Sequence, residues 1–390
     1  LNNKIYIMGY VNMMKEMTVQ QMTEKVFNKE SLFILDVRNE SDFRDWKIEG
    51  ENFDYLNVPY FELIDGVDSI VDRLPKDKDI VVVCAKGGSA AFVAEQLTEA
   101  GFDNVYMLAG GMQAWSEHLH QANVYEDDQL KIYQFIRVGK GCLSYMVISG
   151  SEALVVDPLR FIDVYEQVAQ QEGVKITHIV DSHLHADHLS GGKALAERTG
   201  AAYYLMKSEG AVFDFKPLEQ HDTIDFENVH LEVLAVKTPG HTPGSVSFFV
   251  NGKWLFSGDT IFVGGLGRPD LGGKVAEWAA DLYDTVYEKV AAMADDVIVL
   301  PAHYANLDEE INAEGYVGDT LGRIRARNEM MQNKPKDEFI DLVIQSAKTE
   351  TPPNFEDIVA INRGLKTVDI ETQRELEIGP NRCALHHAHV

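Results

Sequence analysis

Four side chains that can bind a metal ion lie within six consecutive positions of the sequence. They are His183, His185, Asp187 and His188, and they follow the largely apolar run 176–181. Imidazole and carboxylate groups are the usual protein ligands of zinc and iron, and alternate residues at the end of a strand can turn toward one point. The type and spacing of these residues therefore predict a metal centre.

Three residues from later in the chain can complete this centre. His241, Asp259 and His303 each follow an apolar segment and lie near glycine or proline, as expected of ligands on loops at strand ends. A single histidine or aspartate is more often structural or solvated. Seven such residues in this arrangement favour a metal site. These seven possible ligands are compatible with either one or two metal ions.

A second reactive centre is indicated by Cys84, which directly follows the apolar segment 79–83. The loop that it begins continues with Lys86, Gly87, Gly88 and Ser89. Such a loop can direct backbone N–H groups toward the sulfur, and the helix expected over residues 90–100 adds its positive end. We therefore expect Cys84 to be a reactive, partly exposed thiolate.

The elements that must position these residues change in type along the chain. Before residue 120, the patterns predict strands at 32–38, 79–83 and 105–108 and helices at 18–29, 90–100 and from 110 onward. The following strands are expected at 130–138, 143–149, 153–156, 176–181, 202–205, 229–236, 245–250 and 254–257, with helices at 161–171 and 191–199. Helices are expected again at 319–332, 336–347 and 354–364.

This order of elements predicts a two-domain protein of the α/β and α+β classes. Residues 18–120 are expected to form an α/β domain with a parallel sheet, and the polar stretch 121–128 a linker. Residues 129–310 are expected to form two sheets with helices outside them and the ligands at one edge. Residues 311–390 are expected to be a helical C-terminal extension that ends in a polar tail.

The composition disfavours several classes of protein. The 390 residues are 45% hydrophobic, which suits two or three globular domains. The 35 basic and 62 acidic residues give a formal charge of −27, which disfavours nucleic acid as a partner. No apolar run approaches the ~20 residues of a membrane span and the first 17 residues lack the features of a secretory signal, so we expect a cytoplasmic protein.

The three cysteines, Cys84, Cys142 and Cys383, are widely spaced and contain no C-x-x-C pair. An odd number in this spacing argues against a disulfide framework, and the roles of Cys142 and Cys383 stay open.

Residues 18–120 resemble the rhodanese domain family. The landmarks are Asp36-Val37-Arg38, the Cys84 loop, and Gly110-Gly111-Met112 with Trp115. The resemblance implies that Cys84 carries a persulfide and that Lys86, Gly87, Gly88 and Ser89 bind the sulfur substrate. Many rhodaneses end this loop with arginine, whereas Ser89-Ala90 stands here, so Lys86 is the local cation and the activity of this domain is left open.

Residues 127–310 resemble the metallo-β-lactamase superfamily through the motif His183-x-His185-x-Asp187-His188 and the three later residues. This resemblance implies an αββα sandwich. The segment 264–271 resembles the persulfide dioxygenases, in which one Fe(II) is held by two histidines and an aspartate, here His183, His241 and Asp259. The resemblance also implies that His185, Asp187, His188 and His303 orient the ligands and move protons, and that Arg268 binds an anionic group of the carrier thiol.

The function implied by the two resemblances is oxidation of a small-molecule thiol persulfide by dioxygen to sulfite and thiol, coupled to sulfur transfer with sulfite or thiosulfate. A role in sulfide detoxification would follow. One alternative is a thioester hydrolase of the glyoxalase II type with two zinc or iron ions, in which His185, Asp187, His188 and His303 also bind metal. Another is a sensor that binds a partner through Cys84. The carrier thiol and the oligomeric state, a homo-oligomer included, are left open by the sequence.

Overall fold

The computed structural model describes residues 14–234, 244–267, 275–346 and 354–380. The chain divides into two compact units, Leu1–His118 and Leu119–Val390. Within the described ranges, none of the helices has the length and apolar character that a membrane crossing requires. The two-domain architecture expected from the sequence is confirmed.

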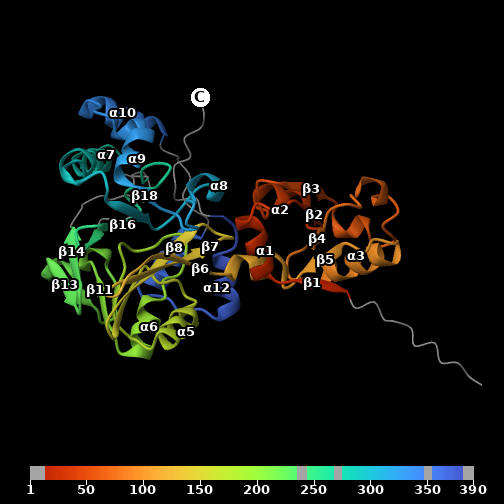
Figure 1. Ribbon diagram of the computed structural model, residues 1–390, viewed down its shortest axis with the longest axis horizontal. Helices are drawn as coiled ribbons and strands as arrows, with labels where there is room; N and C mark the ends of the chain where they lie inside the picture. Colours follow the sequence, from red (N-terminus) through yellow and green to blue (C-terminus); the bar gives the residue numbers. More distant parts are fainter. Residues whose placement is uncertain (1–13, 235–243, 268–274, 347–353, 381–390) are drawn as a thin grey trace, which may run out of the picture. The chain divides into compact units, whose positions relative to one another are not determined.

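The first unit is a five-stranded parallel sheet in the order β1-β5-β4-β2-β3, shown in red to orange in Figure 1. Its strands are β1 (Lys15–Met17), β2 (Leu32–Asp36), β3 (Phe53–Asn57), β4 (Ile80–Val83) and β5 (Val105–Leu108). Its α-helices are α1 (Val19–Phe27), α2 (Glu40–Asp45), α3 (Gly88–Glu99) and α4 (Gly111–Glu117). Thr18 begins α1 with a capping box, since its side chain accepts from the Gln21 N–H and the Gln21 side chain accepts from the Thr18 N–H.

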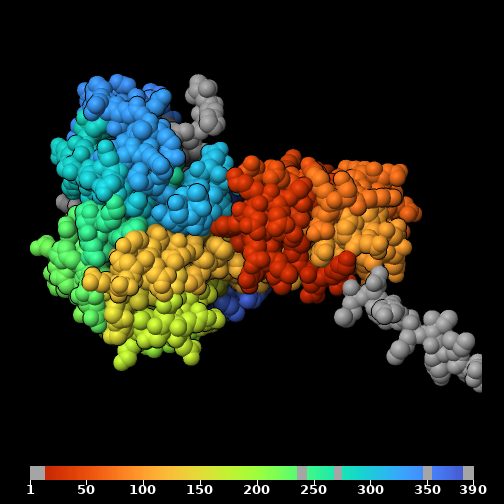
Figure 2. All heavy atoms as spheres, viewed as in Figure 1, coloured from red at the N-terminus to blue at the C-terminus, as the bar shows by residue number. Residues whose placement is uncertain are grey.

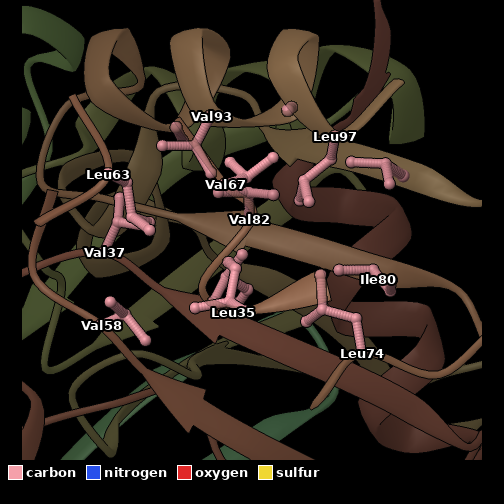
Figure 3. Close-up of a cluster of buried hydrophobic side chains, with 14 of the residues drawn as sticks. Leu35, Val37, Val58, Leu63, Val67, Leu74, Ile80, Val82, Val93 and Leu97 are labelled. Atoms are coloured by element: carbon pink, nitrogen blue, oxygen red, sulfur yellow. The ribbon is translucent and has the colours of Figure 1, made fainter. Parts of the chain in front are cut away.

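The core of the first unit lies between this sheet and α3. Figure 3 shows Leu35 and Val82 of the central strands facing Val93 and Leu97 of the helix. All residues of β2 and β4 are buried, as expected for parallel strands covered on both faces, and this explains their continuous apolar sequence. The Cys84 loop begins where β4 leaves this core.

The second unit contains two sheets. The first has seven strands in the order β12-β11-β10-β9-β8-β7-β6, of which β9 to β12 are parallel and β6 to β9 antiparallel. The strands are β6 (His120–Glu126), β7 (Lys131–Arg137), β8 (Cys142–Ser149), β9 (Glu152–Val156), β10 (Lys175–Val180), β11 (Ala202–Leu205) and β12 (Lys216–Pro217).

The second sheet has six strands in the order β13-β14-β15-β16-β17-β18, and only the pair β16 and β17 is parallel. The strands are β13 (Thr223–Phe226), β14 (Val229–Leu234), β15 (Ser247–Val250), β16 (Trp254–Gly258), β17 (Ile298–Pro301) and β18 (Asp319–Thr320).

Helices cover the outer face of each sheet, which gives the expected αββα sandwich. Helices α5 (Ile162–Glu172) and α6 (Gly192–Thr199) lie on the first sheet, and α7 (Val275–Asp284), α9 (Leu321–Arg327) and α10 (Lys336–Ser346) lie on the second (Figure 1). In the space-filling view, the first sheet and its helices form the yellow and yellow-green surface. This surface is distinct from the cyan and blue surface formed by the helices of the second sheet (Figure 2). The remaining α-helices are α8 (Leu307–Glu310), α11 (Phe355–Asn362) and α12 (Ile370–Leu376).

Two expectations about the chain differ from the structure. The stretch 121–128, expected to be a linker, lies largely in β6, which pairs antiparallel with β7. Its polar residues hid the strand, because β6 is an edge strand with mostly exposed or half-buried side chains. The tail after residue 364, expected to be polar and solvated, contains α12 and the buried Glu377.

Candidate metal centre

The centre forms where one edge of the first sheet meets one edge of the second. Parallel strands end at the same edge, so β9 and β10 bring Asp157 beside the loop that starts at Asp181, and β16 and β17 bring Asp259 beside His303. Backbone hydrogen bonds join the two edges, from Val246 N to Ser182 O and from Leu143 N to Ala302 O, both 2.7 Å. Six of the seven predicted ligands come together in this way. His241 and the predicted substrate residue Arg268 lie outside the described residues.

Asp259 lies between two of the histidines. Its Oδ2 is 3.6 Å from Nε2 of His183, and its Oδ1 is 2.6 Å from Nδ1 of His303. The other ring nitrogen of His303, Nε2, is 3.1 Å from Oδ2 of Asp187. Burial disfavours a charged imidazole, yet the carboxylates of Asp259 and Asp187 outweigh it and raise the pKa of His303 well above its usual value.

The orientation of His183 is set by a hydrogen-bond chain. Nδ1 of His183 is 2.9 Å from the Ser182 hydroxyl, which donates to Oδ2 of Asp157 over 2.9 Å. The hydroxyl therefore accepts from His183 Nδ1–H, and Nε2 is left on the side of Asp259. Asp157 has a positive φ of 52°, a conformation uncommon outside glycine that is found at functional sites.

His185 faces a different set of groups. Its Nε2 is 3.4 Å from Oδ1 of Asp157 and 4.0 Å from Oδ1 of Asp181. Burial, followed by the charge of His188, lowers the pKa of His185 well below its usual value. Burial and the Asp157 charge raise the pKa of Asp181 to about 7, and its Oδ2 accepts hydrogen bonds from Ser190 and Tyr203.

Asp187 and His188 form a third group together with Cys142. Nδ1 of His188 is 3.0 Å from Oδ1 of Asp187 and 3.6 Å from the Cys142 sulfur. The same sulfur is 3.5 Å from Oδ2 of Asp187. Burial disfavours the charged form of His188, but the nearby Asp187 and Cys142 favour it and raise the pKa of His188 to about 10. The sequence left the role of Cys142 open, and the structure places it within this cluster.

The residues present fit a bound metal ion. His183, His185, His188, Asp259 and His303 are all at most 3% exposed. Nδ1 of His185 and Nε2 of His188 are buried without a hydrogen-bond partner among the described residues, which is costly unless an ion or water binds them. Imidazole nitrogens with carboxylate oxygens suit iron and zinc.

The loop that carries the motif is held by a residue of the C-terminal extension. The Nδ2 group of Asn362 donates to the carbonyl oxygens of His185 and His188, both over 2.8 Å, and its Oδ1 accepts from Ser190 N over 3.0 Å. Asn362 is 9% exposed and lies at the end of α11. No sequence pattern singled it out, because an asparagine at a helix end is common.

Glu377 is a second anchor from the same extension. Its Oε1 accepts from Leu189 N over 2.7 Å, and its carboxylate also pairs with Arg137 and Arg160. Burial opposes ionisation of Glu377, but the two guanidinium groups lower its pKa to about 2. Lys140 Nζ donates to the Glu377 carbonyl oxygen over 3.0 Å. The extension is thus part of the support of the metal loop.

The predicted sulfur site of the first unit has the expected local form. Cys84 follows β4, and the N–H of Gly87 donates to the Cys84 sulfur over 3.0 Å. Gly87 has a φ of +103° and precedes α3, so the sulfur lies at the start of that helix. Cys84 is only 5% exposed, less than expected for a reactive thiolate, because the side chain is packed in the core below the loop.

The other two landmarks of the first unit support this loop. The backbone N–H groups of Met112 and Gln113 donate to the carbonyl oxygens of Cys84 and Ala85 over 2.9 and 3.0 Å. Asp36 and Arg38 form a buried salt bridge of 2.7 Å, and Arg38 also donates to the Trp46 carbonyl oxygen. This pair is therefore structural.

Two family models match the chain. Residues 137–305 match the metallo-beta-lactamase superfamily, and residues 18–118 match the rhodanese-like domain.

Curated relatives include two kinds of enzyme. The chain is 34% identical over 155 residues to the mitochondrial persulfide dioxygenase ETHE1 of Bos taurus, which covers 39% of this chain and 59% of that protein. It is 31% identical over 193 residues to a hydroxyacylglutathione hydrolase of Tolumonas auensis, which covers 48% of this chain and 72% of that protein. The chain thus spans about three fifths of the length of the bovine and human persulfide dioxygenases, and 82% of the length of the mouse protein, to which it is 28% identical.

Two solved structures are also similar. A metallo-beta-lactamase from Staphylococcus aureus is 30% identical with a TM-score of 0.55, covering 62% of this chain and 74% of that one. ETHE1 from Myxococcus xanthus is 25% identical with a TM-score of 0.51, covering 60% of this chain and 99% of that one.

Proposed function

Because this chain belongs to the metallo-beta-lactamase superfamily and carries a rhodanese-like domain ahead of its metal-binding domain, we propose that it is an iron-dependent persulfide dioxygenase. One Fe(II) is held by His183, His241 and Asp259. A low-molecular-weight thiol persulfide, dioxygen and water are converted to the free thiol and sulfite, with release of protons. The similarity to ETHE1 proteins supports this reaction.

The observation that carries the proposal is that His183 and His185, although close in sequence, face different partners. His183 Nε2 and Asp259 Oδ2 face each other at 3.6 Å, whereas His185 Nε2 faces Asp157 and Asp181. A set of two histidines and one carboxylate leaves open positions where two reactants can meet. When bound, Fe(II) supplies these positions and the electrons that activate dioxygen.

The protein side chains orient the ligands and handle protons. Asp157 and Ser182 fix the tautomer of His183, and His303 Nδ1–H fixes the carboxylate of Asp259. The burial of these side chains keeps bulk water away from the ligands. His303 also contacts Asp187, and this pair can accept and return a proton within the closed site.

Two further roles complete the proposal. Arg268 binds the carboxylate or phosphate of the carrier thiol, because its planar guanidinium suits either anion.

Cys84 exchanges sulfane sulfur with sulfite or thiosulfate. When thiosulfate donates, its outer sulfur bonds to the Cys84 thiolate, and sulfite leaves with the electron pair of the broken bond. The Gly87 N–H at 3.0 Å from the sulfur supports an anion at this position.

A thioester hydrolase with two metal ions is the second candidate. The similarity to hydroxyacylglutathione hydrolases favours it, and so does the grouping of Asp187, His188 and His303. The ring of His185 lies beside this group, with its centroid 4.2 Å from that of His188. In that case these four residues bind metal in addition to His183, His241 and Asp259.

Oxygen uptake by the iron-loaded, full-length protein across a panel of thiol persulfides tests the proposal. We expect persulfide-dependent uptake with sulfite as product, carried by one thiol in preference to the others, and its loss in His183→Ala. Cleavage of a thioester such as an acylglutathione with no oxygen uptake on any persulfide would overturn the proposal in favour of the hydrolase.

A further inference from the structure

Glu310, the last residue of α8, is a buried carboxyl group to which neither candidate function assigns a role. Only 5% of this residue is exposed. We propose that Glu310 is a positioning residue, which holds the segment that follows Asp259 against the segment that follows His303. The inference rests on the proposed metal centre, and it applies to both candidate functions because each of them assigns Asp259 to a metal ion.

The carboxyl group of Glu310 fixes the turn that follows His303. Its Oε1 accepts hydrogen bonds from the N–H groups of Ala305 and Asn306, over 2.7 and 2.9 Å. These two residues lie between the histidine and α8, which begins at Leu307. Because both donors belong to the backbone, the two bonds restrain the path of the chain directly after His303.

The same carboxyl group contacts a short hairpin formed by residues 260–267. The N–H of Gly264, near the tip of the hairpin, is a further hydrogen-bond donor to Glu310. A Cβ atom at this glycine would lie 3.5 Å from the carboxyl carbon, so the backbone and the carboxyl group are in contact. The hairpin is closed by two backbone hydrogen bonds of 2.9 and 3.0 Å, from Phe262 N to Gly265 O and from Gly267 N to Thr260 O.

The hairpin transmits this restraint to Asp259. It begins directly after Asp259, and a Cβ atom at Gly267 would lie 1.8 Å from the Asp259 carbonyl oxygen, so both ends of the hairpin lie against this residue. Oδ1 of Asp259 is in turn 2.6 Å from Nδ1 of His303. The two segments are therefore joined twice, once by these two side chains and once by Glu310.

Capping of α8 does not by itself explain why Glu310 is buried. The Asn306 side chain already caps this helix, since it accepts from Asp308 N over 3.1 Å. Burial raises the pKa of Glu310, and the backbone donors Asn306, Ala305 and Gly264 act in the opposite direction. A buried carboxylate is costly, and a glutamate in solvent could accept from the turn alone. The contact with the hairpin is what requires the buried position.

Cobalt substitution of the full-length protein tests this role without using either reaction, because the visible bands of bound Co(II) respond to the geometry of its ligands. We expect Glu310→Ala to change these bands and to lower the metal affinity, measured by competition with a chelator, about 10-fold. Glu310→Gln should restore both, since the amide oxygen of glutamine can accept the hydrogen bonds that Oε1 accepts. Glu309→Ala, at the exposed neighbouring position, is the control and should change neither.

Unchanged bands and affinity in a folded Glu310→Ala protein overturn the proposal, and a loss of stability alone would assign Glu310 to the capping of α8. Bands in Glu310→Gln that match those of Glu310→Ala also overturn it, because the backbone contacts are then not the cause.

If Glu310→Ala does not fold, Glu310→Asp takes its place, since its carboxylate is one methylene too short to contact both segments. The same change of bands is expected, and unchanged bands contradict the role. Cobalt bands absent from the unsubstituted protein contradict the metal centre itself. Bands that respond to Glu310 in a protein without oxygen uptake contradict the dioxygenase reaction alone.

Discussion

The side-chain amide nitrogen of Asn362 lies 2.8 Å from the carbonyl oxygen of His185, although 177 residues separate them in the sequence. The same nitrogen donates to the His188 carbonyl oxygen, also over 2.8 Å. A loop that presents several candidate metal ligands needs a fixed backbone, and Asn362, at the end of helix α11 in the C-terminal extension, supplies part of that support.

Replacing Asn362 with aspartate tests this support. Asn362→Asp keeps the acceptor for Ser190 N but removes the donor, and places a carboxylate oxygen against two carbonyl oxygens. We expect metal affinity to fall about 10- to 100-fold, as is typical when a group that orients ligands is lost. Competition with a chelator measures the affinity. Glu356→Gln, at an exposed position on the same helix, is the control. An unchanged affinity in a folded Asn362→Asp protein contradicts the role.

Glu377 should make stability depend on pH. Its pKa is lowered to about 2 in the folded protein because Arg137 and Arg160 surround it, although burial acts in the opposite direction. A lowered pKa gives stability that is complete above the unfolded pKa of about 4.3 and is lost as the pH falls from about 5 toward 2. The contribution at neutral pH is about 3 kcal/mol, since each pKa unit corresponds to about 1.4 kcal/mol.

Urea unfolding of Glu377→Gln measures this contribution. The variant should be about 3 kcal/mol less stable than the unsubstituted protein at pH 7, and the difference should shrink as the pH approaches 2. Glu375→Gln, exposed on α12, should show neither effect. A difference that is independent of pH would assign the loss to packing and not to the ion pairs.

Gly258 is required where β16 delivers Asp259 to the site. Its φ is +55°, and a Cβ atom there would lie 2.8 Å from the Ser182 hydroxyl oxygen, which is part of the chain that orients His183. Gly258→Ala should therefore cost about 2 to 3 kcal/mol and reduce metal content. Gly252→Ala is the matched control: Gly252 has a φ of +66° with open space around it, and only the backbone cost of about 1 kcal/mol is expected. Equal effects of the two substitutions on stability and metal content would refute the steric explanation.

Cys84→Ser should separate the two proposed activities. Sulfur transfer to or from thiosulfate is expected to be lost, because serine cannot carry a persulfide, while persulfide-dependent oxygen uptake persists. Product ratios of sulfite and thiosulfate measure both at once, with Cys383→Ser as the control. Unchanged formation and use of thiosulfate in Cys84→Ser would show that the domains are not coupled through this thiol.

Much of the fold follows from apolar patterns in the sequence. Strands β2 and β4 are buried along their whole length, and the largely apolar runs that predict them result directly from this burial. The sequence of β6 predicts a linker and not a strand, because half-exposed edge strands carry little hydrophobic signal. α12 was missed for a similar reason, since none of its residues is buried.

The sequence predicts those site residues that belong to a short motif or directly follow a strand. It does not predict those whose contacts lie far away in the sequence. The motif residues 183–188 are recognisable by their type and spacing. Asp259 and His303 are recognisable by their positions after strands. Asp157 follows β9 as Asp259 follows β16, so the same rule could have found it. Asn362 and Cys142 offer no such signal, because their partners are brought to them only by the packing of the two sheets and the C-terminal helices.

The hydrogen bond from Leu189 N to Glu377 has a consequence for biosynthesis. A ribosome makes the motif loop long before residue 377, so the nascent chain displays several imidazoles on a loop that lacks its final anchors. The complete set of anchors exists only after Asn362 and Glu377 have been added and have packed against the rest of the second unit. The fixed loop that the candidate metal ligands require therefore forms only after residue 377 has been synthesised.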